Sequence, residues 1–174
     1  MAKQIVNRVA NSIIKTIDLE ELYPKGTRIA LDIAPWLYEG IILKEKDFRE
    51  IVSTHPWEQY TNQYVSIHCT ADAIIPAWAF MLVSTKLIPH TKKTVIGSQQ
   101  NLETILFTEI LNNLDLSEYQ DAPVIIKGCA SKPVPAAAYV RAQRRRRCSS
   151  RAVAYHLKAC PGRTRAVVAA ISTW

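Results

Sequence analysis

Apolar and polar residues alternate in several short segments of the chain, and each such segment predicts a β-strand. Residues 28–33 alternate in this way, and a second apolar segment, residues 37–43, follows Pro35. Because these two segments are close in sequence, we expect them to pair as antiparallel strands. Residues 46–53 are expected to form a short helix that ends before Pro56.

The middle of the chain has a more regular order of elements. Three apolar segments predict strands at residues 64–69, 93–97 and 123–128. The longer segments between them, residues 73–86 and 102–113, predict helices. The first of these helices starts either directly after Asp72, as its cap, or at Pro76, where a missing N–H costs nothing. Strands that are joined through helices run parallel in one sheet. We therefore expect an α/β fold with a small mixed sheet, in which a β-α-β-α-β parallel core is extended by the N-terminal antiparallel pair.

The positive net charge of the chain is confined to its C-terminal part. Residues 1–140 contain 13 Lys and Arg against 15 Asp and Glu, whereas residues 141–174 contain 9 basic residues and no acidic one. We expect residues 1–140 to form a single α/β domain. The composition of residues 141–174 is typical of out-of-frame translation, so we interpret them as a frame-shifted, non-native tail. The alternatives are a disordered extension and a phosphate-binding arm.

No membrane span or export signal is indicated. The longest apolar run, residues 73–83, has 11 residues, against the roughly 20 that a membrane-spanning helix needs. The four cysteines have neither the spacing of a metal-binding motif nor the density of a disulfide scaffold. We therefore expect a cytoplasmic protein with reduced thiols and no membrane partner. Nucleic acid is expected to bind only non-specifically, through the basic tail.

Two cysteines lie at the ends of predicted parallel strands. Cys69 ends one strand and Cys129 follows another, so both are expected at the edge where parallel sheets bind ligands. A thiol before a helix N-terminus is favoured as thiolate, which binds metal or attacks an electrophile. Two thiolates are too few for a zinc or iron–sulfur site, and Asp72 is the candidate third ligand. The alternatives are that Asp72 caps the next helix and that both thiols are structural.

A candidate anion site follows the last predicted strand. Gly128 and the small residues after it expose backbone N–H groups beside Lys127 and Lys132. The segment has no phosphate-loop or dinucleotide-binding pattern. No catalytic triad, zinc-protease or zinc-finger pattern occurs either, so no catalytic residue is assigned.

Several segments resemble an uncharacterised family that is typical of Bacteroidota, the domain-of-unknown-function family 2480. The resembling segments are residues 7–10, 36–40, 43–49, 69–76, 127–129 and 132–135. The resemblance covers residues 4–140 and ends after Val140. It implies a small cytoplasmic protein with no established activity, whose members are often encoded near genes for iron–sulfur cluster assembly.

The leading hypothesis is an accessory factor in iron–sulfur cluster assembly or metal handling. In it, Cys69, Cys129 and Asp72 hold iron, zinc or an iron–sulfur cluster, and iron–sulfur assembly proteins are the partners. The genomic association that the resemblance implies carries most of this hypothesis. One alternative is a non-catalytic interaction domain with structural cysteines, and another is a thiol-dependent enzyme with Cys69 as the nucleophile.

Overall fold

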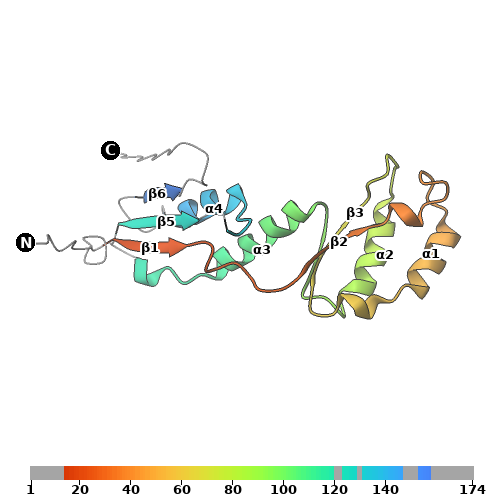
Figure 1. Ribbon diagram of the computed structural model, residues 1–174, viewed down its shortest axis with the longest axis horizontal. Helices are drawn as coiled ribbons and strands as arrows, with labels where there is room; N and C mark the ends of the chain where they lie inside the picture. Colours follow the sequence, from red (N-terminus) through yellow and green to blue (C-terminus); the bar gives the residue numbers. More distant parts are fainter. Residues whose placement is uncertain (1–13, 120–122, 129–130, 147–152, 158–174) are drawn as a thin grey trace, which may run out of the picture. The chain divides into compact units, whose positions relative to one another are not determined.

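The computed structural model describes residues 14–119, 123–128, 131–146 and 153–157, and it confirms the expected α/β class (Figure 1). The chain divides into two compact units. The central unit is Pro24–Ile105, and the terminal unit combines Met1–Tyr23 with Leu106–Trp174. Each unit has its own parallel three-stranded sheet and its own hydrophobic core. None of the helices in the described residues is long and apolar enough to cross a membrane.

The sheet of the central unit consists of three parallel strands, β2 (Arg28–Asp32), β3 (Tyr64–His68) and β4 (Lys93–Ile96). Their order is β2-β3-β4, and Val65 of β3 pairs with Ile29 on one side and with Thr94 on the other. The expected strands at residues 64–69 and 93–97 are confirmed, and so is their parallel pairing. The strand expected at residues 28–33 is also present, but it pairs in parallel with β3.

Helices connect these parallel strands. Helix α1 (Glu45–Thr54) and the 3-10 segment Trp57–Tyr60 lie between β2 and β3, and α2 (Ala77–Leu87) lies between β3 and β4. Each helix buries positions four residues apart, which lie on one face. The buried positions are Phe48 and Val52 in α1, and Ala79, Val83 and Leu87 in α2. They pack with inward-facing residues of the strands into one core.

Helix α2 begins later than residue 73, where the apolar pattern starts. Of the two expected starts, after Asp72 or at Pro76, the structure favours the second, because the helix begins at Ala77, directly after Pro76 in extended conformation. A proline before the first turn costs the helix no hydrogen bond, because the first N–H groups of a helix have no partner within the helix. The interpretation of Asp72 as the helix cap is therefore wrong, and its side chain is exposed.

The antiparallel partner expected for residues 28–33 does not exist. Residues Ala34–Trp36 form a 3-10 turn, and the chain then folds back on itself through an isolated antiparallel bridge between Tyr38 and Ile42. Glu39 and Gly40 between them both have positive φ, 49° and 75°. The apolar segment 37–43 is thus a tight turn, because two left-handed residues reverse the chain within it.

Helix α3 (Gln99–Asn113) starts three residues before its expected position at residue 102, and the boundary between the two units falls within it. Its first half is held to β2 by an ion pair, in which Arg28 Nε donates to Glu103 Oε1 at 2.7 Å. The side chains of this pair are only 9% and 7% exposed. The pair is therefore shielded from solvent, and losing one partner leaves a buried charge.

The sheet of the terminal unit also consists of three parallel strands, β1 (Lys15–Asp18), β5 (Val124–Gly128) and β6 (Val153–Leu157), in the order β1-β5-β6. Helix α4 (Ala136–Arg146) follows β5. The core contains residues in and directly after β1, alternate residues of β5, and one face each of α3 and α4: Ile17, Leu19, Phe107, Leu111, Val124, Ile126, Ala138 and Ala142. Helix α4 continues across residue 140, where the domain was expected to end. A single domain over residues 1–140 and a non-native tail over residues 141–174 stay predictions.

The single sheet expected from the sequence is therefore wrong. The strand at 123–128 is present as β5, but it pairs with β1 and β6 in the terminal unit and not with β3 or β4. Period-two patterns identify strands but not their partners, and the strands at Lys15–Asp18 and Val153–Leu157 were not among those expected. Without these two strands, the only available partners for β5 were those of the other unit.

Candidate functional site

The strands of the central sheet end side by side, and the loops that follow them form the candidate site. The first backbone groups beyond the strands continue the ladder, since Ile33 N donates to His68 O at 3.0 Å and Gly97 N donates to Ile67 O at 2.8 Å. Three loops therefore leave the sheet at one edge, starting at Ile33, Cys69 and Gly97. Ligands of open parallel sheets bind at this edge.

Asp32, the last residue of β2, binds the loop that contains Cys69. Its carboxylate accepts the Thr70 hydroxyl at 2.5 Å, the Thr70 backbone N–H at 3.1 Å and the Ala34 N–H at 2.9 Å. Burial by itself raises the pKa of Asp32, but these hydrogen bonds outweigh it and lower the pKa below 3.8. The ionised carboxylate thus fixes the first residues after β3 against the end of β2.

Cys69 directly follows β3 and is partly buried against the core of the central unit. Its thiol donates a hydrogen bond to Ala71 O at 3.8 Å. The thiol does not lie in the first turn of a helix, because α2 begins only at Ala77. The expectation that the dipole of the following helix favours the thiolate is therefore wrong.

A hollow of about 430 Å³ lies beside Cys69. Its walls are mostly apolar and come from β3, β4, α2 and the loops between them: Ile67, Ile75, Phe80, Ile96, Gly97 and Ser98 are among its lining residues. This volume is in the range of sites for small molecules, which is roughly 300–1,000 Å³. Cys69 supplies the only thiol among the described lining residues.

The loop after β4 brings the start of α3 to the same hollow. Ser98 precedes the helix, and its Oγ accepts the backbone N–H of Asn101 at 3.2 Å. Gly97 has a φ of +128°, and a Cβ there would lie 2.7 Å from Asn101 Nδ2. A glycine is therefore required at this turn, and it places Ser98 at the edge of the sheet.

The two cysteines expected as metal ligands follow strands of different sheets. Cys69 follows β3 of the central sheet, whereas Cys129 comes directly after β5, which belongs to the terminal sheet. The expectation that both thiols lie at the edge of one sheet is therefore wrong. Cys129 itself lies outside the described residues, and Asp72 is exposed in the loop after Cys69. Within the described residues, no group of three or more His, Cys, Asp or Glu side chains could hold a metal ion.

The expected anion site has carboxylate and carbonyl neighbours. Lys127 Nζ lies 2.8 Å from Asp18 Oδ2, and hydrogen bonds outweigh burial to lower the pKa of Asp18. Lys132 Nζ donates to Glu20 O at 2.8 Å. Gly128 is buried at the end of β5. An anion here would compete with Asp18 for Lys127, and the site stays a prediction.

Sequence reasoning missed the polar residues of the edge, Asp32, Thr70 and Ser98. A weak signal existed for Asp32, because an acidic residue at the end of an alternating strand often binds the neighbouring loop or a ligand. Thr70 had no such signal, since its role depends on the pairing of β2 with β3. Ser98 could have been recognised as a helix cap three residues before Asn101.

Comparisons with known proteins point to one family. No curated protein and no solved structure matches the chain. A family model matches residues 3–161, so the similarity extends beyond its expected end at Val140. Because this match covers most of the chain, the protein belongs to the family described as "Protein of unknown function (DUF2480)".

Proposed function

We propose that the protein acts through the Cys69 thiol, which captures a ligand in the hollow at the carboxyl edge of the central sheet. The observation that carries this proposal is the position of the thiol. It lines a hollow of about 430 Å³ and makes a single hydrogen bond, at 3.8 Å, among the described residues. A weakly bonded thiol beside a cavity can bond to a soft metal ion or to an electrophilic carbon.

The first form of this function is metal handling. A cytoplasmic accessory factor of this kind would receive and pass on iron, zinc or an iron–sulfur cluster as its cargo, with iron–sulfur assembly proteins as partners. Cys69 and Cys129 each come directly after a parallel strand, and Asp72 offers a further oxygen ligand. Because Cys69 has too few ligand-type neighbours among the described residues, the cargo needs further donors, which the partner protein would supply.

Purification without oxygen tests this form directly. The expected result is stoichiometric iron or zinc in the wild-type protein and its loss in Cys69→Ser. Ser84→Ala, in α2, serves as a matched control that leaves the thiols intact. A metal-free wild-type protein, before and after reconstitution with ferrous iron and sulfide, would eliminate metal handling.

The second form is a thiol-dependent enzyme with Cys69 as the nucleophile, favoured by the size of the hollow beside the thiol. Iodoacetamide is a suitable probe, because the sulfur displaces iodide, forms an S–C bond and loses its proton to water. We expect peptide mass spectrometry to find Cys69 labelled faster than the other cysteines at pH 7. If Cys69 is neither labelled nor needed for metal, it is structural, and the protein is a non-catalytic interaction domain.

A further inference from the structure

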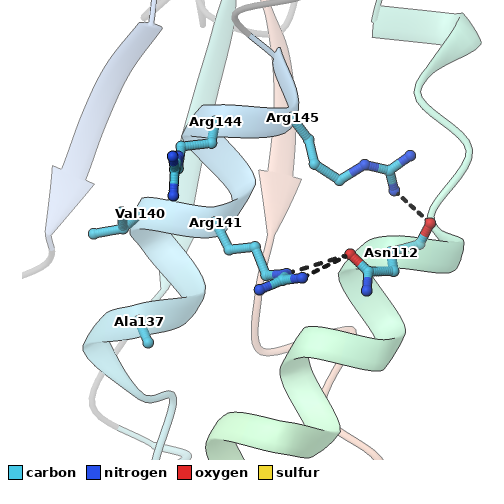
Figure 2. Close-up of a pocket in the computed structure, with 6 residues that line it drawn as sticks. All are labelled: Asn112, Ala137, Val140, Arg141, Arg144 and Arg145. Carbon is cyan, nitrogen blue, oxygen red and sulfur yellow. Dashed lines mark hydrogen bonds between the residues drawn. The ribbon is translucent and has the colours of Figure 1, made fainter.

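A groove between α3 and α4 in the terminal unit is lined by three arginines. Its lining residues are Asn112 of α3 and Ala137, Val140, Arg141, Arg144 and Arg145 of α4, and we call it the arginine groove. Its volume is about 790 Å³. Figure 2 shows Arg141 and Arg145 reaching from α4 toward α3.

The groove has an excess of positive charge. Arg144 and Arg145 follow Arg141 by three and four residues, a spacing that makes side chains neighbours on a helix surface. Like charges at this spacing repel one another, and none of the described lining residues is acidic. A bound anion would remove this repulsion, so the groove is electrostatically suited to a negatively charged ligand.

The three arginines differ in how many of their donors the protein already uses. Arg145 binds backbone carbonyls at the end of α3, with Nη1 at 2.8 Å from Asn112 O and 3.1 Å from Leu114 O. Arg141 directs Nε and Nη2 to Asn112 Oδ1 at 3.3 and 3.2 Å (Figure 2). Arg144 is exposed and makes no hydrogen bond or ion pair to the described residues. The guanidinium group of Arg144 and the Nη1 group of Arg141 are therefore available to donate hydrogen bonds to a ligand.

We propose that the arginine groove binds a ligand with two adjacent phosphate groups, of the nucleoside diphosphate or pyrophosphate type. Guanidinium groups match the geometry of phosphate oxygens. Residues three apart on a helix have Cβ atoms about 5–6 Å apart, so the long side chains of Arg141 and Arg144 can turn toward one ligand and bind neighbouring phosphates. Val140 is 57% exposed beside them and gives an apolar surface for the rest of the ligand. This site is independent of Cys69, which belongs to the other unit. It takes residues 141–145 as native sequence, in line with the family match over residues 3–161 and against their interpretation as a frame-shifted tail.

Calorimetric titration of the full chain with pyrophosphate and with ADP tests the proposal. Arg144→Gln is the informative variant, because Arg144 has no structural bond that the substitution would break. We expect it to weaken binding about tenfold, the effect of losing one charge-assisted hydrogen-bonding group. Lys46→Gln, at an exposed position of α1, removes the same charge elsewhere and should leave the affinity unchanged. Circular dichroism of each variant verifies that the fold is intact.

Three results would overturn the proposal. The first is the absence of binding by wild-type protein at 20 mM salt. The second is an equal loss in Arg144→Gln and Lys46→Gln, which would show attraction by net charge alone. The third is tighter binding of a single-stranded RNA that is insensitive to Arg144→Gln, which would indicate contact of a polyanion with the basic segment as a whole.

Discussion

The aromatic ring of Tyr139 occupies the space that a side chain on Gly128 would need. A Cβ built on Gly128 would lie 2.8 Å from Tyr139 Cζ and 3.1 Å from Cε1, and it would also collide with the hydroxyl oxygen. Gly128 ends β5 and Tyr139 is the fourth residue of α4. Helix α4 therefore reaches its position on the terminal sheet only because residue 128 has no side chain.

Substitution of Gly128 by alanine is expected to destabilise the protein. The backbone conformation of Gly128 does not require glycine, so the clash with Tyr139 is the cause, and overpacking of this kind costs about 1–3 kcal/mol. Urea unfolding measures the change. In the Tyr139→Ala background, the same substitution should cost less, because its neighbour is gone. An equal loss of unfolding free energy in the wild-type and Tyr139→Ala backgrounds would contradict a clash with Tyr139 as the cause.

Breaking the buried ion pair between β2 and α3 is expected to have a large effect. Glu103→Ala leaves Arg28 buried without its carboxylate, which costs roughly 3–5 kcal/mol. The matched control is Glu45→Ala, whose partner Arg49 lies at 2.9 Å but in a pair that is 55% and 64% exposed. An exposed pair is worth about 0.5 kcal/mol. Similar unfolding midpoints for Glu103→Ala and Glu45→Ala would contradict the expected difference between the buried and the exposed ion pair.

His55 makes the stability of the central unit sensitive to pH. Its ring lies against Trp57 and Tyr60, and its Nε2 is 3.0 Å from the Tyr60 hydroxyl. Burial lowers the pKa of His55 below 6.5. As the pH falls, the unfolded chain therefore binds more protons than the folded chain, and the folded state loses stability. Its contribution is fully present above pH 6.5 and is lost as the pH falls through the folded-state pKa.

Thermal unfolding followed by tryptophan fluorescence between pH 7.5 and 5.5 measures this dependence. His55→Gln should flatten the curve, whereas His90→Gln, in the turn after α2, should not. A wild-type protein whose melting temperature rises on acidification over this interval would contradict the assignment.

Asp32 is expected to control access to Cys69. Asp32→Ala removes charge-assisted hydrogen bonds to the loop after β3, each worth about 1.5–3 kcal/mol, so thiol labelling should accelerate about tenfold. The measurement uses a chain in which the other three cysteines are serine. Asp115→Ala is the control, because it breaks a similar turn in the other unit. In that turn the Asp115 carboxylate accepts hydrogen bonds from Ser117 N and Ser117 Oγ, both at 2.9 Å. Asp115→Ala should not change the rate at Cys69.

Glu39 is a non-glycine residue in the left-handed region, with a φ of 49°. Such a conformation costs roughly 1–2 kcal/mol, which Glu39→Gly should recover in part as a higher unfolding midpoint. Glu39→Ala removes the same carboxylate but keeps the steric cost, so it should not stabilise the protein. A gain for alanine equal to that for glycine would point to charge rather than to the backbone.

The chain's local patterns determined the class of the fold and most of its elements. Apolar alternation identified the strands around residues 28–33, 64–69, 93–97 and 123–128, because residues on opposite faces of a strand meet different environments. The helices expected at residues 46–53 and 102–113 are present as α1 and α3, with bounds within three residues of those expected. Cys69 was correctly placed at the carboxyl end of a parallel strand.

Tertiary structure alone decided which strands are neighbours. Strand pairing depends on contacts between distant segments, such as Ile17 with Ile126, and no local period encodes them. Two sheets replaced the expected one, and Cys69 and Cys129 were thereby assigned to different units. The role of Asp32 likewise exists only because β2 pairs with β3, which brings its carboxylate to the Thr70 amide.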